Sequence, residues 1–141
     1  MYTILCSKCW SVKEKKADIC KICYDHIGIE VDDFLSNTIQ ILNKNNCHTT
    51  FCCSGHVNDD GRFYIAFDKV YSFKNDLPKL FKIENKEDHI VIRVSDKELE
   101  IKRTIPEKID FVAELNKSIY EWVKKEFPEK QPEVLFFFGD R

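Results

Sequence analysis

The sequence has no run of apolar residues approaching the roughly 20 that a transmembrane helix needs. Its first ten residues, MYTILCSKCW, also lack the basic segment and apolar core of a secretory signal peptide. These two absences predict a cytoplasmic protein with no membrane partner. In a reducing compartment, the seven cysteines are expected to be thiols and metal ligands rather than disulfides.

The chain also lacks several motifs of common enzyme classes. It contains no Walker-type phosphate loop, no GxGxxG fingerprint, no HExxH sequence and no paired-carboxylate motif. An excess of one charge is missing too, because the formal net charge is only -2. Residues 1–24 hold five lysines and two acidic residues, a formal +3, so the remaining residues sum to -5. RNA docking on the slightly basic N-terminal segment stays an alternative that charge alone does not support.

Two cysteine doublets give the clearest pattern, C-x2-C-x10-C-x2-C, formed by Cys6, Cys9, Cys20 and Cys23. Each doublet can contact one metal ion from one side, so the two together supply the four corners of a tetrahedron. We therefore predict a structural zinc ion (Zn²⁺) and a small four-cysteine zinc ribbon over residues 1–28. Four thiolates complete the coordination sphere, so the function must lie elsewhere in the chain.

Residues 29–141 are predicted to form an α+β domain with a mostly antiparallel sheet and about three helices. Apolar periodicity and capping residues place these helices at 30–43, at 75–81 and from Pro106 to shortly before Pro128. Alternating residues predict hairpins over 47–67 and 89–104. The apolar tail at 134–138 is expected to be a last strand or to pack on the core.

Reactive side chains gather after the strand that begins at Cys47. The Ser54 and Gly55 N–H groups can face outward as a nest that binds carboxylate or phosphate oxygens. This observation favours a pocket in which Ser54, Gly55 and His56 hold an anionic group, with Thr50 and Cys52 alongside.

Three other interpretations of the same segment remain open. Cys52 or Cys53 could be a nucleophile activated by His56 or His48, although spacing identifies no residue to orient the histidine. A second metal site is disfavoured because adjacent cysteines on a strand point in opposite directions; its candidate ligands are Cys47, His48, Cys52, Cys53 and His56. In the third interpretation the cysteines are small core residues and Ser54-Gly55 only makes the turn.

A short stretch of the chain resembles a known family. Leu42-Asn43, Thr49-Thr50 and Cys53-Ser54-Gly55 are similar to the signature of the wybutosine-synthesis tRNA methyltransferases, over roughly residues 39–67. The resemblance implies S-adenosylmethionine as cofactor and methyl transfer to a modified guanosine in tRNA. It adds Thr49 and Cys53 to the expected site, whose full set is then Thr49, Thr50, Cys53, Ser54, Gly55 and His56.

The leading hypothesis is therefore a zinc-ribbon protein whose α+β domain binds a small anionic or nucleotide-like ligand at the Cys53–His56 turn. One alternative is an S-adenosylmethionine-dependent enzyme that modifies tRNA or nucleotides. The other is a protein-interaction module in which the zinc is purely structural.

Overall fold

The computed structural model describes residues 2–25, 27–59 and 62–128, and it confirms an α+β fold with antiparallel sheets. The predicted element at 134–138 lies outside these residues. In chain order the elements are β1 (Tyr2–Cys6), β2 (Val12–Lys13), β3 (Gly28–Asp32), η1 (Asp33–Leu35), α1 (Ser36–Lys44), β4 (Thr49–Cys53), η2 (Val57–Asp59), β5 (Tyr64–Phe67), β6 (Phe81–Asn85), β7 (Ile90–Val94), α2 (Asp96–Leu99) and α3 (Ile105–Glu126).

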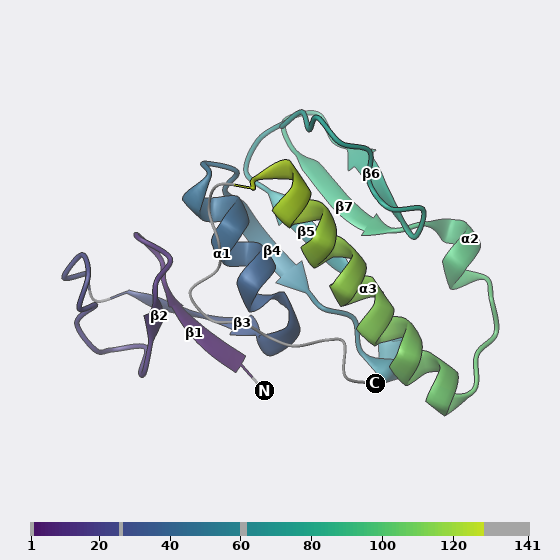
Figure 1. The fold of residues 1–141 in the computed structure, drawn as a ribbon, viewed down its shortest axis with the longest axis horizontal. Coiled ribbons are helices and arrows are strands. Elements are labelled where there is room, and N and C mark those ends of the chain that lie inside the picture. Colours follow the sequence, from purple (N-terminus) through teal and green to yellow (C-terminus); the bar gives the residue numbers. More distant parts are fainter. Residues whose placement is uncertain (1, 26, 60–61, 129–141) are drawn as a thin grey trace.

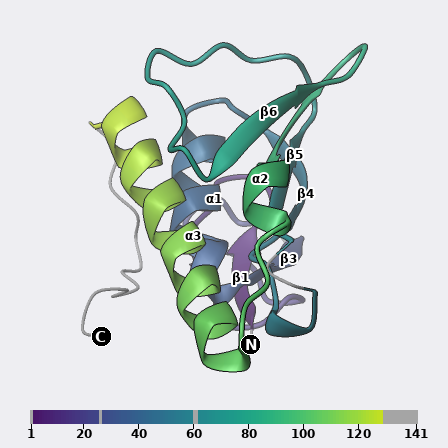
Figure 2. The same ribbon diagram turned by 90° about the vertical axis from the view of Figure 1, so that its right-hand side faces the viewer.

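The strands form two separate sheets. A three-stranded sheet has the order β2-β1-β3, and a four-stranded sheet has the order β4-β5-β7-β6. The helices α1 and α3 lie side by side on one face of the four-stranded sheet, while the three-stranded sheet lies beyond α1 (Figures 1 and 2). The core lies between the four-stranded sheet and these two helices.

Helix α1 is the element on which both sheets pack. Every residue from Ser36 to Asn43 is buried, which leaves no solvent-facing stripe of the usual amphipathic kind. The Gln40 side-chain amide donates to the Trp10 carbonyl oxygen at 3.0 Å, so a residue from the cysteine-rich segment is bound directly to this helix. The N-terminal sheet and the helix therefore form a shared interface.

The helix predicted from residue 30 begins instead at Ser36. The backbone of Gly28–Asp32 pairs with β1 in an antiparallel ladder, with Val31 opposite Thr3. This pairing holds the backbone in an extended conformation, so its C=O groups cannot accept the i+4 hydrogen bonds that would start a helix. The predicted start of the helix was wrong because the periodicity of residues 30–43 contains no information about β1, the distant strand with which β3 pairs.

The short helix predicted over residues 75–81 is also wrong. Asn75 does not cap a helix; its backbone N–H and its side-chain amide both donate to the carboxylate of Glu126, at 2.9 and 2.8 Å. Trp122 Nε1 donates to the Asn75 carbonyl oxygen at 3.1 Å. The segment is therefore held as a loop against the end of α3, and β6 begins at Phe81.

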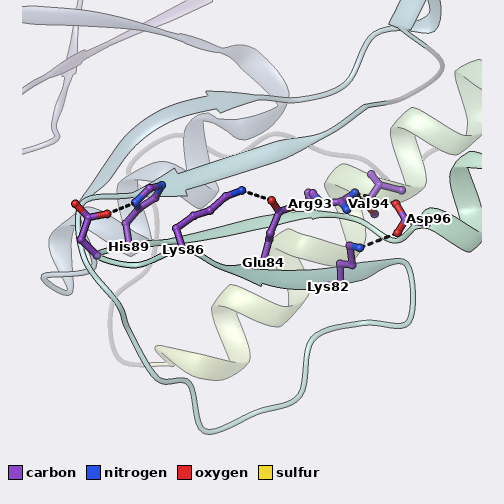
Figure 3. Close-up of polar contacts among 8 residues, drawn as sticks. Lys82, Glu84, Lys86, His89, Arg93, Val94 and Asp96 are labelled. Atoms are coloured by element: carbon purple, nitrogen blue, oxygen red, sulfur yellow. Dashed lines mark hydrogen bonds and ion pairs between the residues drawn. The ribbon is translucent and has the colours of Figure 1, made fainter.

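The second hairpin joins β6 to β7 and not, as predicted, residues 89–94 to 99–104. Asp96–Leu99 forms α2, which leads toward α3 instead of turning the chain back. Figure 3 shows the charged residues that line the hairpin: Glu84 contacts Arg93 and Lys86, and Asp96 accepts from Lys82 at 2.8 Å. Arg93 lies directly opposite Lys82 and diagonally across from Glu84, so its ion pair with Glu84 is a diagonal contact between the two strands.

The long C-terminal helix is confirmed. Thr104 and Glu107 form a capping box at its start, and Pro106 lies in its first turn. Its buried face contains Val112, Leu115, Ile119, Trp122 and Val123. Among the described residues, no helix has both the length and the apolar character needed to cross a bilayer.

The contacts of Glu126 predict a pH-dependent contribution to stability. Burial raises the pKa of this carboxyl, but the N–H groups of Lys74 and Asn75 outweigh it and lower the pKa. The contribution is thus present above the unfolded carboxyl pKa of about 4.3 and is lost as the pH falls through the folded pKa. We expect Glu126→Ala to lower the free energy of unfolding by about 1–2 kcal/mol at pH 7, measured by urea denaturation. The exposed Glu121→Ala is the matched control, and equal effects of the two variants would contradict this account.

Candidate metal centre and adjoining pocket

The four predicted zinc ligands converge on one point. The Sγ atoms of Cys6 and Cys23 are 3.5 Å apart, as are those of Cys9 and Cys20. All four lie within 4.8 Å of one another. A zinc ion with Zn–S bonds of about 2.3 Å separates its sulfur ligands by about 3.8 Å. The cluster therefore has the spacing of a tetrahedral metal site and not that of disulfides.

The two doublets adopt the same local conformation. The N–H of Trp10 donates to the Cys6 carbonyl oxygen, and the N–H of Tyr24 donates to the Cys20 carbonyl oxygen, each at 2.9 Å. Trp10 and Tyr24 both have left-handed backbone angles, with φ of 65° and 62°. This turn directs both sulfurs of a doublet to one side, which is why a two-residue spacing suits a metal.

Backbone N–H groups also tune the cysteine thiols. Those of Cys23 and Ile22 lower the pKa of Cys20 to about 6. Burial raises the pKa of Cys6, but backbone N–H groups outweigh it and lower the pKa overall. The Asp25 N–H lowers the pKa of Cys23, whereas burial and the neighbouring thiols raise it to about 12. Backbone N–H groups therefore favour the thiolate forms of Cys20 and Cys6, and the thiolate is the form that binds metals.

Gly28 allows the loop between the doublets to close on β3. A Cβ atom at this position would lie 3.0 Å from both Cα and the carbonyl oxygen of Lys16. Backbone atoms cannot move aside as a flexible side chain can. The absence of a side chain at Gly28 therefore permits the close approach that encloses the four-cysteine cluster.

A pocket of about 470 Å³ lies beside the Ser54–His56 turn. Its walls come from the N-terminal sheet, η1, the turn after β4 and the first half of α3; the lining residues are Tyr2, Asp32, Asp33, Phe34, Ser54, Gly55, His56, Val57, Ile109, Val112 and Ala113. Three of the six predicted ligand-binding residues, Ser54, Gly55 and His56, are in this lining. Thr49, Thr50 and Cys53 are not.

Asp32 and Asn116 fix the turn from two sides. Asp32 Oδ2 accepts from the Ser54 N–H at 3.0 Å and from Ser54 Oγ at 2.9 Å. The buried Asn116 amide donates to the Ser54 carbonyl oxygen at 2.8 Å. Gly55 then takes a φ of 83°, which glycine adopts without a steric penalty. The Ser54 N–H that was expected to face an anion thus already has a carboxylate partner.

The residues that precede the turn have structural contacts. Asn43 binds Thr49 twice, accepting from its N–H at 3.1 Å and donating to its Oγ1 at 3.0 Å. Cys52 packs against the core, and burial raises the pKa of its thiol to about 12. A protonated thiol is a weak nucleophile, so Cys52 does not fit the catalytic alternative. Thr50 is exposed outside the pocket.

Asp32 is the residue that sequence reasoning missed. Its carboxylate Oδ2 lies 3.7 Å from His56 Nε2, and Cys53 joins these two within 4.8 Å. Among the candidate ligands for a second metal, only Cys53 and His56 come together in this way. Asp32 lies 22 residues before Ser54 and inside a predicted helix, so no local pattern linked it to the turn. Recognising residues 28–32 as a strand would have placed Asp32 at a strand end, outside the predicted helix.

Comparisons with protein-family models, with curated proteins and with solved structures find no match for this chain.

The role of Asn116 in holding the turn predicts a measurable loss of stability. Asn116→Ala removes the donor to the buried Ser54 carbonyl, which should lower the free energy of unfolding by about 1–3 kcal/mol. Thermal or urea unfolding measures this change, and the adjacent exposed Lys117→Ala serves as control. Unchanged stability in Asn116→Ala would show that the turn does not depend on this contact.

Proposed function

We propose that this protein is a zinc-stabilised binding module. In this proposal Cys6, Cys9, Cys20 and Cys23 hold a structural zinc ion, and the pocket beside the Ser54–His56 turn binds a small nucleotide-like ligand. The observation that carries the binding function is that the predicted residues Ser54, Gly55 and His56 line a pocket of about 470 Å³, a volume that a small molecule can occupy.

The chemistry of the walls supports a ligand with a planar ring and polar groups. Tyr2 and Phe34 are both exposed beside the pocket, at 62% and 37% of their surface, and aromatic side chains of this kind stack on nucleobases. Asp32 and Asp33 can accept hydrogen bonds from the ring's N–H groups. An anionic part of the ligand would meet these two carboxylates unless a cation lay between them.

The methyltransferase hypothesis stays a prediction, with S-adenosylmethionine as its distinguishing ligand. No described feature favours it beyond the motif at residues 49–55. RNA as a partner likewise remains a hypothesis that binding experiments can test.

The structural zinc has a direct test by native mass spectrometry. After dialysis against a chelator, the wild-type chain should keep one zinc ion, because four thiolates close the site. Cys20→Ser should lose that ion together with the fold of the N-terminal sheet, since structural zinc supplies about 10–16 kcal/mol of binding free energy. Cys47→Ala, which removes a cysteine outside the cluster, should keep it. A folded wild-type chain with no metal, or with iron in place of zinc, would refute the proposal.

The binding function can be tested by calorimetry with guanosine monophosphate, adenosine and S-adenosylmethionine. We expect guanosine monophosphate to bind the wild-type chain. Ala113→Leu places a larger side chain in the pocket lining and should weaken binding by at least about tenfold, or 1.4 kcal/mol. Ala66→Leu, on β5 and outside the lining, is the control.

Each outcome separates the hypotheses. Equal affinity in Ala113→Leu and wild type would exclude this pocket as the site. Heat from S-adenosylmethionine alone would favour the enzyme alternative, and no heat from any of the three ligands would leave the interaction-module alternative.

A further inference from the structure

Three side chains of different chemistry meet at the edge of the pocket. One carboxylate oxygen of Asp32, the sulfur of Cys53 and one ring nitrogen of His56 all lie within 4.8 Å of one another. They come from the end of β3, the end of β4 and the turn that follows β4. Oxygen, sulfur and nitrogen are the three donor types that zinc accepts from proteins.

The spacing of this group is compatible with three ligands of one metal ion. His56 Nε2 and Asp32 Oδ2 are 3.7 Å apart, which is too long for a hydrogen bond, normally about 2.7–3.2 Å. Two ligands bonded to one tetrahedral zinc at about 2.1 Å lie about 3.4 Å apart. A metal ion between the two side chains thus requires only a small inward movement.

Hydrogen bonds from Ser54 hold the Asp32 carboxylate in place, as neighbouring residues usually do for the ligands of a metal site. Asp32 has only 16% of its side chain exposed, and Ser54 donates to its Oδ2 twice, from the backbone N–H and from Oγ. Hydrogen bonds of this kind orient ligating carboxylates and raise metal affinity. His56, with 55% of its side chain exposed, can rotate to complete the site.

A catalytic triad of the same three residues fits the geometry less well. In a triad the histidine uses one ring nitrogen for the carboxylate and the opposite one for the nucleophile. Here a single ring nitrogen of His56 lies within 4.8 Å of both the Asp32 oxygen and the Cys53 sulfur. The three donor atoms converge on a common point, which suits one metal ion.

We propose that Asp32, Cys53 and His56 form a second zinc site, distinct from the four-cysteine cluster. Three protein ligands leave one coordination position for water or for a ligand atom, as in zinc sites that bind substrates. Because Asp32 and His56 both line the pocket, that position borders it. This part of the inference rests on the proposed function: the ion supplies the positive charge that a phosphate group needs beside Asp32 and Asp33.

The test counts zinc in the full chain. Protein loaded with zinc chloride and freed of excess metal by gel filtration should carry two zinc ions by native mass spectrometry. His56→Ala and Cys53→Ser should each carry one. The controls His48→Ala and Cys52→Ser remove a neighbouring residue of the same type and should keep two. In competition with a chromophoric chelator, His56→Ala should lower the zinc affinity of the second site by more than about 100-fold. Even changes to residues that only contact a metal ligand lower metal affinity about 10–100-fold.

One zinc ion in the wild type, or two in His56→Ala, would overturn the inference. His56 is exposed, so its removal should leave the fold intact, and circular dichroism checks this. Guanosine monophosphate then separates the two proposals. A wild-type chain with two zinc ions that does not bind the nucleotide would support the metal site and refute the pocket function. A wild-type chain with one zinc ion that binds the nucleotide would support the pocket function and refute the metal site.

Discussion

The arrangement of the pocket depends on the hydrogen bonds between the Asp32 carboxylate and Ser54. Asp32 ends a strand of the N-terminal sheet and accepts two hydrogen bonds from Ser54, which directly follows a strand of the other sheet. A hydrogen bond to a charged partner contributes more than a neutral one, about 1.5–3 kcal/mol. Through this contact the two sheets are fixed relative to each other, and the turn that carries His56 is fixed with them.

In our proposal, the two cysteine-containing clusters differ as structural and functional metal sites do, since a structural zinc has four protein ligands and a functional one keeps a position open. Four sulfurs make up the first, and one of them belongs to Cys6, the last residue of β1 in the sheet that packs against the fully buried helix α1. In our proposal, a metal there would stabilise β1 and, through the ladder between them, β3, which ends in Asp32. The second cluster has three ligands and borders a pocket. Metal binding at the first site would then help to position Asp32, a proposed ligand of the second.

The sequence alone predicted the parts of the molecule that local patterns determine. The C-x2-C doublets, the long helix after Pro106 and the hairpin through Phe67 depend on spacing, capping and alternation within a few residues. It failed where a distant partner decides the outcome. Residues 30–32 fit a helical periodicity but pair with β1, and Asn75 is bound by Glu126 from the end of α3. Asp32 was missed for the same reason.

Anomalous X-ray diffraction from crystals of the zinc-loaded chain, recorded at the zinc absorption edge, tests the account most directly. It should show two peaks, one among Cys6, Cys9, Cys20 and Cys23 and one between Asp32, Cys53 and His56. A single peak at the four cysteines, with the second group ordered and without metal, would contradict the account.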